Sequence, residues 1–110
     1  MKRYEKIKKN YEFDFILNQG KSLNNKYFNI FFVESKSFKP KFGIAVGKKV
    51  GNAVVRNKLK RIVTSMIDQN KYLFKNNRNY IIIVKDKCLK IKYEILEKEF
   101  INLLKEEKNE

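Results

Sequence analysis

The sequence predicts an α/β (α+β) two-layer sandwich, in which helices pack on a small mixed sheet in the order α-β-β-α-β-α. Three patterns lead to this fold class. Residues 27–34 and 42–48 alternate as strands do, and residues 80–84 form an uninterrupted apolar run. Residues 52–69 and 92–105 repeat apolar side chains at helical spacing. A chain of 110 residues can bury a core of its own, so we expect one domain.

A short helix is expected near the N-terminus. Asn10 is a residue type that caps helices, and Glu12 lies where the positive end of the helix dipole favours an acid. We expect the helix to run to Leu17, with Gly20 as its stop signal. Residues 21–26 are polar and predict a loop.

Two strands should follow. Residues 27–34 place Phe28, Ile30 and Phe32 on one face and apolar residues on the other as well, so the second face needs a cover or offers a surface to a ligand. In the strand 42–48 one face is nearly bare, because it carries Gly43, Ala45 and Gly47. A bare face permits close approach of a backbone, which can be a tightly packed helix or RNA.

A basic amphipathic helix is predicted over residues 52–69. Val55, Leu59, Ile62 and Met66 recur at i, i+4, i+7 and i+11 and form the stripe that we expect to be buried. Cations flank this stripe, so they should project together from a rigid element. The side chains concerned, with those just before the helix, are Lys48, Lys49, Arg56, Lys58, Lys60 and Arg61.

The last two elements are a strand and a helix. The run at 80–84 is typical of a strand buried on both faces. The helix at 92–105 presents Leu96, Phe100, Leu103 and Leu104 as its buried stripe. The polar residues 106–110 are expected to form a frayed tail of the single domain 1–110.

The charge balance points to an anionic partner. The formal net charge is +14 and the isoelectric point is near 9.9, which favours binding to nucleic acid or to an anionic membrane surface. Scattered lysines can also be ordinary surface residues of a protein from an A/T-rich genome. That alternative does not account for the cluster at 48–61, where two of the four arginines lie.

Several kinds of chemistry are excluded by residue types. The chain has one cysteine, Cys88, and no histidine, so histidine-based catalysis and Cys₂His₂ or Cys₄ zinc sites are impossible within it. We therefore expect Cys88 to be a packing residue. No apolar signal segment follows the basic N-terminus, and the longest apolar runs are too short to span a bilayer. A soluble, cytoplasmic protein is expected.

The basic helix has groups suited to RNA. Arg56 and Arg61 can hold phosphates with two hydrogen bonds each, whereas Lys58 and Lys60 act as point charges. Asn57 can donate to a phosphate or to a 2′-hydroxyl, or it can bond the local backbone and touch no ligand.

Two aromatic residues suggest a place for unpaired bases. Phe13 and Phe31 can form an aromatic floor on which bases stack, although core packing is the stronger explanation for each of them taken alone.

The segment Gly51-Asn52-Ala53-Val54-Val55-Arg56-Asn57-Lys58-Leu59-Lys60-Arg61, after a strand that ends in Lys48-Lys49, resembles the signature of the bacterial ribonuclease P protein family. The resemblance covers nearly the whole chain. It implies a left-handed β-α-β crossover and a protein subunit that assists a catalytic RNA in removing the 5′ leader of precursor tRNA. The partner RNA, with Mg²⁺ bound mainly by that RNA, would carry out hydrolysis. No residue of this chain is assigned as catalytic or as a metal ligand, and the sequence leaves open whether the protein has metal sites.

Carried residue by residue, the resemblance implies two surfaces. The RNA-binding set is Lys48, Lys49, Asn52, Arg56, Asn57, Lys58, Lys60 and Arg61. The cleft that binds the single-stranded leader would be lined by Phe13, Leu17 and Phe31. The chain departs from the pattern at Lys58, where arginine is common, at Thr64, which is often basic, and at Leu17, which is often aromatic.

Two other functions compete. A general RNA-binding or ribosomal protein could share this fold, but it would have no reason to carry the Arg-Asn-basic motif in this context. A self-sufficient nuclease would need paired carboxylates or a histidine. Asp14, Asp68 and Asp86 fall on three different predicted elements, which disfavours that class.

Overall fold

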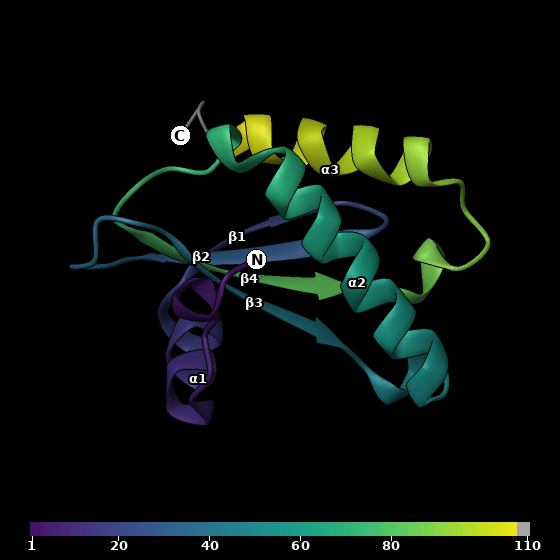
Figure 1. Ribbon diagram of the computed structural model, residues 1–110, viewed down its shortest axis with the longest axis horizontal. Helices are drawn as coiled ribbons and strands as arrows, with labels where there is room; N and C mark the ends of the chain where they lie inside the picture. Colours follow the sequence, from purple (N-terminus) through teal and green to yellow (C-terminus); the bar gives the residue numbers. More distant parts are fainter. Residues whose placement is uncertain (108–110) are drawn as a thin grey trace.

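A four-stranded mixed sheet lies at the centre of the computed structural model, which describes residues 1–107. The strands follow the order β1-β2-β4-β3, and helices pack on both faces (Figure 1). This arrangement confirms the predicted fold class, with one strand more than expected. The elements are η1 (Arg3–Glu5), α1 (Asn10–Gln19), β1 (Lys21–Asn24), β2 (Phe28–Glu34), β3 (Lys41–Val46), η2 (Lys48–Val50), α2 (Ala53–Gln69), η3 (Lys71–Leu73), β4 (Arg78–Val84), η4 (Asp86–Cys88) and α3 (Tyr93–Glu107).

The basic helix α2 connects two parallel neighbours, β3 and β4. β2 pairs antiparallel with β4, and β1 pairs antiparallel with β2. In Figure 1, β3 and β4 point to the right with β4 above β3, and α2 passes in front of the sheet, which gives the crossover its left-handed sense. Because parallel strands end at the same edge, the segments that follow β3 and β4 meet at one end of the molecule.

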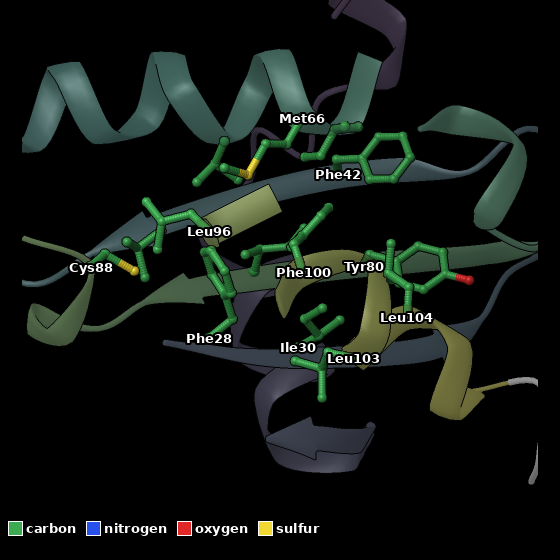
Figure 2. Close-up of a cluster of buried hydrophobic side chains, with 14 of the residues drawn as sticks. Phe28, Ile30, Phe42, Met66, Tyr80, Cys88, Leu96, Phe100, Leu103 and Leu104 are labelled. Carbon is green, nitrogen blue, oxygen red and sulfur yellow. The ribbon is translucent and has the colours of Figure 1, made fainter. Parts of the chain in front are cut away.

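The main core lies between the sheet and the helices α2 and α3. Phe28, Ile30 and Phe32 of β2 are buried on this face, as their alternation predicted. The rings of Phe28 and Phe100 meet edge to face with their centroids 5.3 Å apart, in the middle of the cluster shown in Figure 2. The predicted stripe of α3 is confirmed as buried.

The opposite face of the sheet is only half covered. α1 crosses it near the starts of β3 and β4 (Figure 1). Ile16 of α1 forms a small second core with Ile7 and Ile81. Phe31 and Ile83 pack against this core but keep part of their surface exposed. The sheet beyond α1 is therefore an open apolar surface.

The prediction of a loop at 21–26 was wrong in its first part. Lys21–Asn24 forms β1, with Lys21 opposite Phe32 of β2. β1 is an edge strand in which only Leu23 is half-buried, so its composition carries no alternating signal. Pairing with a strongly apolar neighbour, rather than its own side chains, makes this segment a strand.

The predicted ends of α1 also need correction. The helix begins at Asn10, the capping position is Lys9, and no side chain caps it. The helix continues beyond Leu17 to Gln19, and Gly20 then has an extended rather than a left-handed backbone. Glycine is needed there for space, because a Cβ at position 20 would lie 2.8 Å from the Phe32 carbonyl oxygen.

The predicted frayed tail is wrong for its first residues, while 108–110 lie outside the described residues. Glu107 belongs to α3 and is fully buried. Its Oε2 accepts hydrogen bonds from the Tyr80 hydroxyl at 2.7 Å and from Arg78 Nη1 at 2.5 Å. These two bonds hold the last turn of α3 against the start of β4.

Candidate nucleic-acid interface

A segment without acidic residues precedes and includes most of α2. Between Glu34 and Asp68 the sequence contains lysines and arginines but no aspartate or glutamate. The segment covers β3, η2 and α2 almost to its last turn. From Lys36 to Arg61 its cations therefore have no acidic residue between them, and the first acid that follows them is Asp68 at the end of α2, which makes this side of the molecule electropositive.

Asn52 starts the helix. Its Oδ1 accepts a hydrogen bond from the backbone N–H of Val55 at 3.0 Å, so it is the N-cap of α2. This occupies the carbonyl oxygen of the amide and leaves its Nδ2 at the surface. Lys48 and Lys49 lie just before it in η2, both exposed. The cap thus fixes the direction in which the first turn presents its cations.

The buried side of α2 differs in part from the predicted stripe. Leu59 and Met66 are buried as expected, but Val55 and Ile62 are only half-buried. Val63 and Ile67 are buried in their place, because the helix rests on the sheet with that side. Val55 and Ile62 face the connection between β4 and α3, which covers them incompletely.

The remaining polar residues of the motif are at the surface. Asn57, Lys58, Lys60 and Arg61 are exposed, and Arg56 is half-buried. Within residues 1–107, none of the motif's cations lies within ion-pair distance of a carboxylate. The Nε–H group of Arg56 is buried and has no hydrogen-bond partner in this part of the chain. An unpaired buried donor is uncommon in folded proteins, so a turn of this side chain toward solvent would let an external acceptor pair with it.

α2 presents its cations in more than one direction. Lys60 and Thr64 line a groove of about 240 Å³ together with Phe13 and Gly43. On the other flank, Lys58 lines a second groove beside the connection between β4 and α3. The basic helix therefore borders both the α1 side and the α3 side of the molecule. Thr64 is half-buried and its hydroxyl donates to the Lys60 carbonyl at 2.8 Å.

The predicted cleft residues are only partly brought together. Phe13 lies on Gly43, and both Phe13 and Phe31 pack around the second core. Leu17 is 37% exposed on the next turn of α1 and does not belong to that cluster. Phe13 is the residue that joins the two predicted surfaces, since it shares a groove with Lys60.

Sequence reasoning missed a second group of cations. Lys85, Lys87, Lys90 and Lys92 lie in the connection between β4 and α3, and the last three are exposed. Lys85 instead donates to the Asn25 carbonyl at 2.7 Å and to the side chain of Asn24. The sequence contained a signal for this group, since a lysine occurs at every second or third position of residues 85–92.

Groups that could support protein-based hydrolysis do not gather in the described chain. Within residues 1–107, no three Asp, Glu or Cys side chains lie where they could hold a metal ion together. Cys88 is buried, as predicted for a packing residue, and burial raises the pKa of its thiol to about 11. No helix in this range has the length and apolar composition needed to cross a membrane.

The sequence and the fold of this chain are similar to those of known proteins. The family model described as Ribonuclease P matches residues 1–108. The ribonuclease P protein component of Mycoplasma mycoides is 43% identical over 107 residues, covering 96% of this chain and 98% of that protein. The corresponding Bacillus cereus protein is 37% identical, covering 96% and 92%. The solved structure of the Thermotoga maritima RNase P protein superposes with a TM-score of 0.85 at 30% identity, covering 93% and 96%.

Proposed function

Because this chain belongs to the ribonuclease P protein family and is the protein subunit of that tRNA 5′-processing ribonucleoprotein, we propose that it binds rather than cuts. In this proposal the catalytic RNA of ribonuclease P docks on the basic side of α2, precursor tRNA is the substrate, and the RNA removes the 5′ leader. The action takes place in the cytoplasm, where precursor tRNA is made.

The observation that carries the proposal is a set of cations on one rigid helix and just before it, none of which lies within ion-pair distance of a carboxylate of residues 1–107. Asn57, Lys58, Lys60 and Arg61 are exposed on α2, and Lys48 and Lys49 are exposed just before it. A fixed array of cations suits the phosphates of a folded RNA, and each phosphate it neutralises releases condensed counterions. Arg56 adds an Nε–H without a partner in residues 1–107, and a turn of its half-buried side chain toward the RNA would pair it with a phosphate or 2′-hydroxyl oxygen.

The leader is proposed to follow the open half of the sheet. Phe31 and Ile83 offer a partly exposed apolar floor, and Phe13 and Leu17 of α1 form one wall. Partly exposed aromatic rings let bases stack without regard to sequence. Lys60 lies in the same groove as Phe13, so a strand that leaves the floor would meet the cations of α2.

Hydrolysis is assigned to the RNA and its Mg²⁺. The protein offers no histidine, and its described carboxylates and thiol do not gather into a metal-holding group. In this proposal, Mg²⁺ held by the RNA would supply the activation of water and the charge stabilisation that phosphodiester hydrolysis needs. The protein's own part is to neutralise phosphates, so that the RNA and its substrate approach each other at lower Mg²⁺.

The binding surface can be tested with exposed residues alone. Lys60→Ala with Arg61→Ala should weaken binding of ribonuclease P RNA and flatten the plot of log K against log salt by roughly 0.7–0.9 for each lost contact. The matched control is Lys98→Ala with Lys105→Ala, two exposed lysines of α3. Equal losses in the two variants would show that only net charge matters, and the surface assignment would be wrong.

A further inference from the structure

A groove of about 320 Å³ lies between α2 and the connection from β4 to α3. Val55 and Ile62 of α2 form one wall, and Leu89 and Ile91 of the connection form the other. Figure 1 shows this connection beside the first half of α2. Cys88 and Leu96, which lie together at one end of the core in Figure 2, close the bottom. The volume is at the small end of ligand pockets.

The rim of this groove is cationic. Lys58 stands on the α2 side and Lys90 on the other, and no carboxylate of the described residues 1–107 lines the groove. Lys87 and Lys92 are exposed on the same connection, whose only acid between residues 85 and 92 is Asp86. An occupant must therefore combine an apolar part that enters the slot with a negative charge that stays at its edge.

We propose that this groove takes one unpaired nucleotide of the partner RNA, with its base between Ile62 and Leu89 and its phosphates on Lys58 and Lys90. A nucleotide joins a flat, largely apolar base to an anionic backbone, which is the combination that the slot and its rim require. Unstacked bases in loops and bulges are what proteins commonly bind in RNA. The inference rests on the proposed function, because Lys58 belongs to the surface on which that RNA docks.

The position of the groove favours RNA over other anionic partners. Lys58 belongs both to the basic face of α2 and to the rim of the groove, so an RNA docked on that face would reach the mouth of the groove. Leu89 is 36% exposed, which leaves an apolar side chain accessible beside the lysines. The open sheet beside α1 lies on the opposite side of the molecule, so this groove is separate from the proposed leader path.

The test is a chemical footprint of ribonuclease P RNA with variants that fill the slot. Leu89→Trp should plug the groove, while Ile95→Trp places the same ring on an exposed position of α3 outside it. Dimethyl sulfate and 2′-hydroxyl acylation should show one unpaired nucleotide protected by the wild type and by Ile95→Trp but reactive with Leu89→Trp. The rest of the footprint should stay. Complete protection with Leu89→Trp would overturn the proposal.

A second variant removes the charge without filling the slot. Lys90 has a left-handed backbone with φ of 63°, which asparagine tolerates, so Lys90→Asn keeps the turn. It should flatten the salt dependence of RNA binding by roughly 0.7–0.9, whereas Lys98→Asn on α3 should flatten it less. The double variant Lys58→Gln with Lys90→Asn should lose less RNA-binding free energy than the sum of the two single variants, because both lysines hold one nucleotide. Full additivity would contradict a shared nucleotide.

The outcomes separate the two proposals. If the wild type leaves no footprint on the RNA, the proposed function itself fails. If the α2-dependent footprint is present but insensitive to Leu89→Trp, only the groove proposal fails. Loss of binding to phosphatidylglycerol vesicles by Leu89→Trp, with the RNA footprint intact, would assign the groove to a lipid surface and likewise reject the nucleotide.

Discussion

Phe13 of α1 lies so close to Gly43 of β3 that a Cβ at position 43 would fall 2.5 Å from Phe13 Cζ. The bare side of β3 is therefore filled by an aromatic ring of the protein itself. The same ring lines the groove that contains Lys60 of α2. Gly43 thus sets how deeply α1 sits on the sheet, and it fixes the distance between the first helix and the basic helix.

Gly43→Ala should push Phe13 away from the sheet. Packing an extra methyl group into a filled site typically costs about 1–3 kcal/mol, which urea unfolding would measure. Because Phe13 borders the groove, affinity for precursor tRNA should fall as well. Gly47→Ala is the matched control, since a Cβ there meets nothing within 4 Å. Similar stability of both variants would show that the Phe13 contact is not tight in solution.

Phe31→Ala tests whether the open sheet binds the leader. Phe31 is half-buried, so the variant should lose less stability than the roughly 3–5 kcal/mol expected for a fully buried phenylalanine such as Phe28. If a base stacks on Phe31, affinity for precursor tRNA should fall by ~1–3 kcal/mol. Affinity for mature tRNA, which lacks the leader, should barely change. Equal losses for both RNAs would remove Phe31 from the binding surface.

The fold could be predicted where side chains repeat with a clear period. The alternation in β2, the apolar run in β4 and the stripe of α3 all lie where the sequence placed them. β1 could not be found in this way, because its register with β2, and not its own polar residues, makes it a strand. The burial of Glu107 was equally hidden, since it depends on Arg78 and Tyr80, which are distant in the sequence.

The candidate site was predictable as a set of residue types but not as a surface. Helical spacing placed the cations of the motif on α2, and the structure exposes all of them except Arg56, which is half-buried. Spacing alone could not show that Lys60 shares a groove with Phe13, or that Lys58 faces Lys90. The first relationship arises from the packing of α1 on the sheet and the second from the connection that follows β4, so separate segments of the chain reach the two flanks of one helix.

Tyr80→Phe should weaken the attachment of the end of α3 to β4. We call the hydrogen bonds of Tyr80 and Arg78 to Glu107 the anchor. The Tyr80 hydroxyl donates to Glu107 at 2.7 Å and accepts from the Lys75 backbone N–H at 3.0 Å. Its removal takes one of two donors from the buried Glu107 carboxylate and takes the acceptor from the Lys75 N–H, and it should cost about 1–3 kcal/mol in thermal or urea unfolding. Tyr72→Phe, at a residue that is 77% exposed, should have almost no effect. An equally small effect at Tyr80 would mean that the anchor contributes little.

Alkaline titration gives a second measure of this anchor. Burial and the hydrogen bond to Glu107 raise the pKa of Tyr80 above its ordinary value. A raised folded pKa gives a contribution to stability that is complete below the unfolded value near 10 and is lost as pH rises above it. Tyr80→Phe should therefore lose less stability than the wild type above about pH 10. If the free energy of unfolding of Tyr80→Phe and of the wild type fell in parallel above this pH, ionisation of Tyr80 would not contribute to stability.

Glu5→Gln should change the acid side of the stability curve. Burial alone would raise the pKa of Glu5, but hydrogen bonds from Lys71 and from the Lys2 backbone outweigh it and lower the pKa below its usual range. The stabilisation of the folded state by the Glu5 carboxylate is present above the pKa that Glu5 has in the unfolded chain. It is lost as pH falls through the pKa that Glu5 has in the folded protein. The variant should be less stable by roughly 1 kcal/mol near pH 7 and should converge with the wild type in acid. A constant gap at every pH would contradict this.

Reconstitution of the protein with a ribonuclease P RNA tests most directly whether the protein binds while the RNA cleaves. Cleavage of precursor tRNA would be followed at low Mg²⁺ with RNA alone, with rigorously RNA-free protein, and with both together. We predict single-site removal of the 5′ leader by the combination, little cleavage by RNA alone at this Mg²⁺ concentration, and none by the protein. Leader removal by the RNA-free protein, or no gain when protein is added to the RNA, would contradict a subunit that binds while its partner RNA cuts.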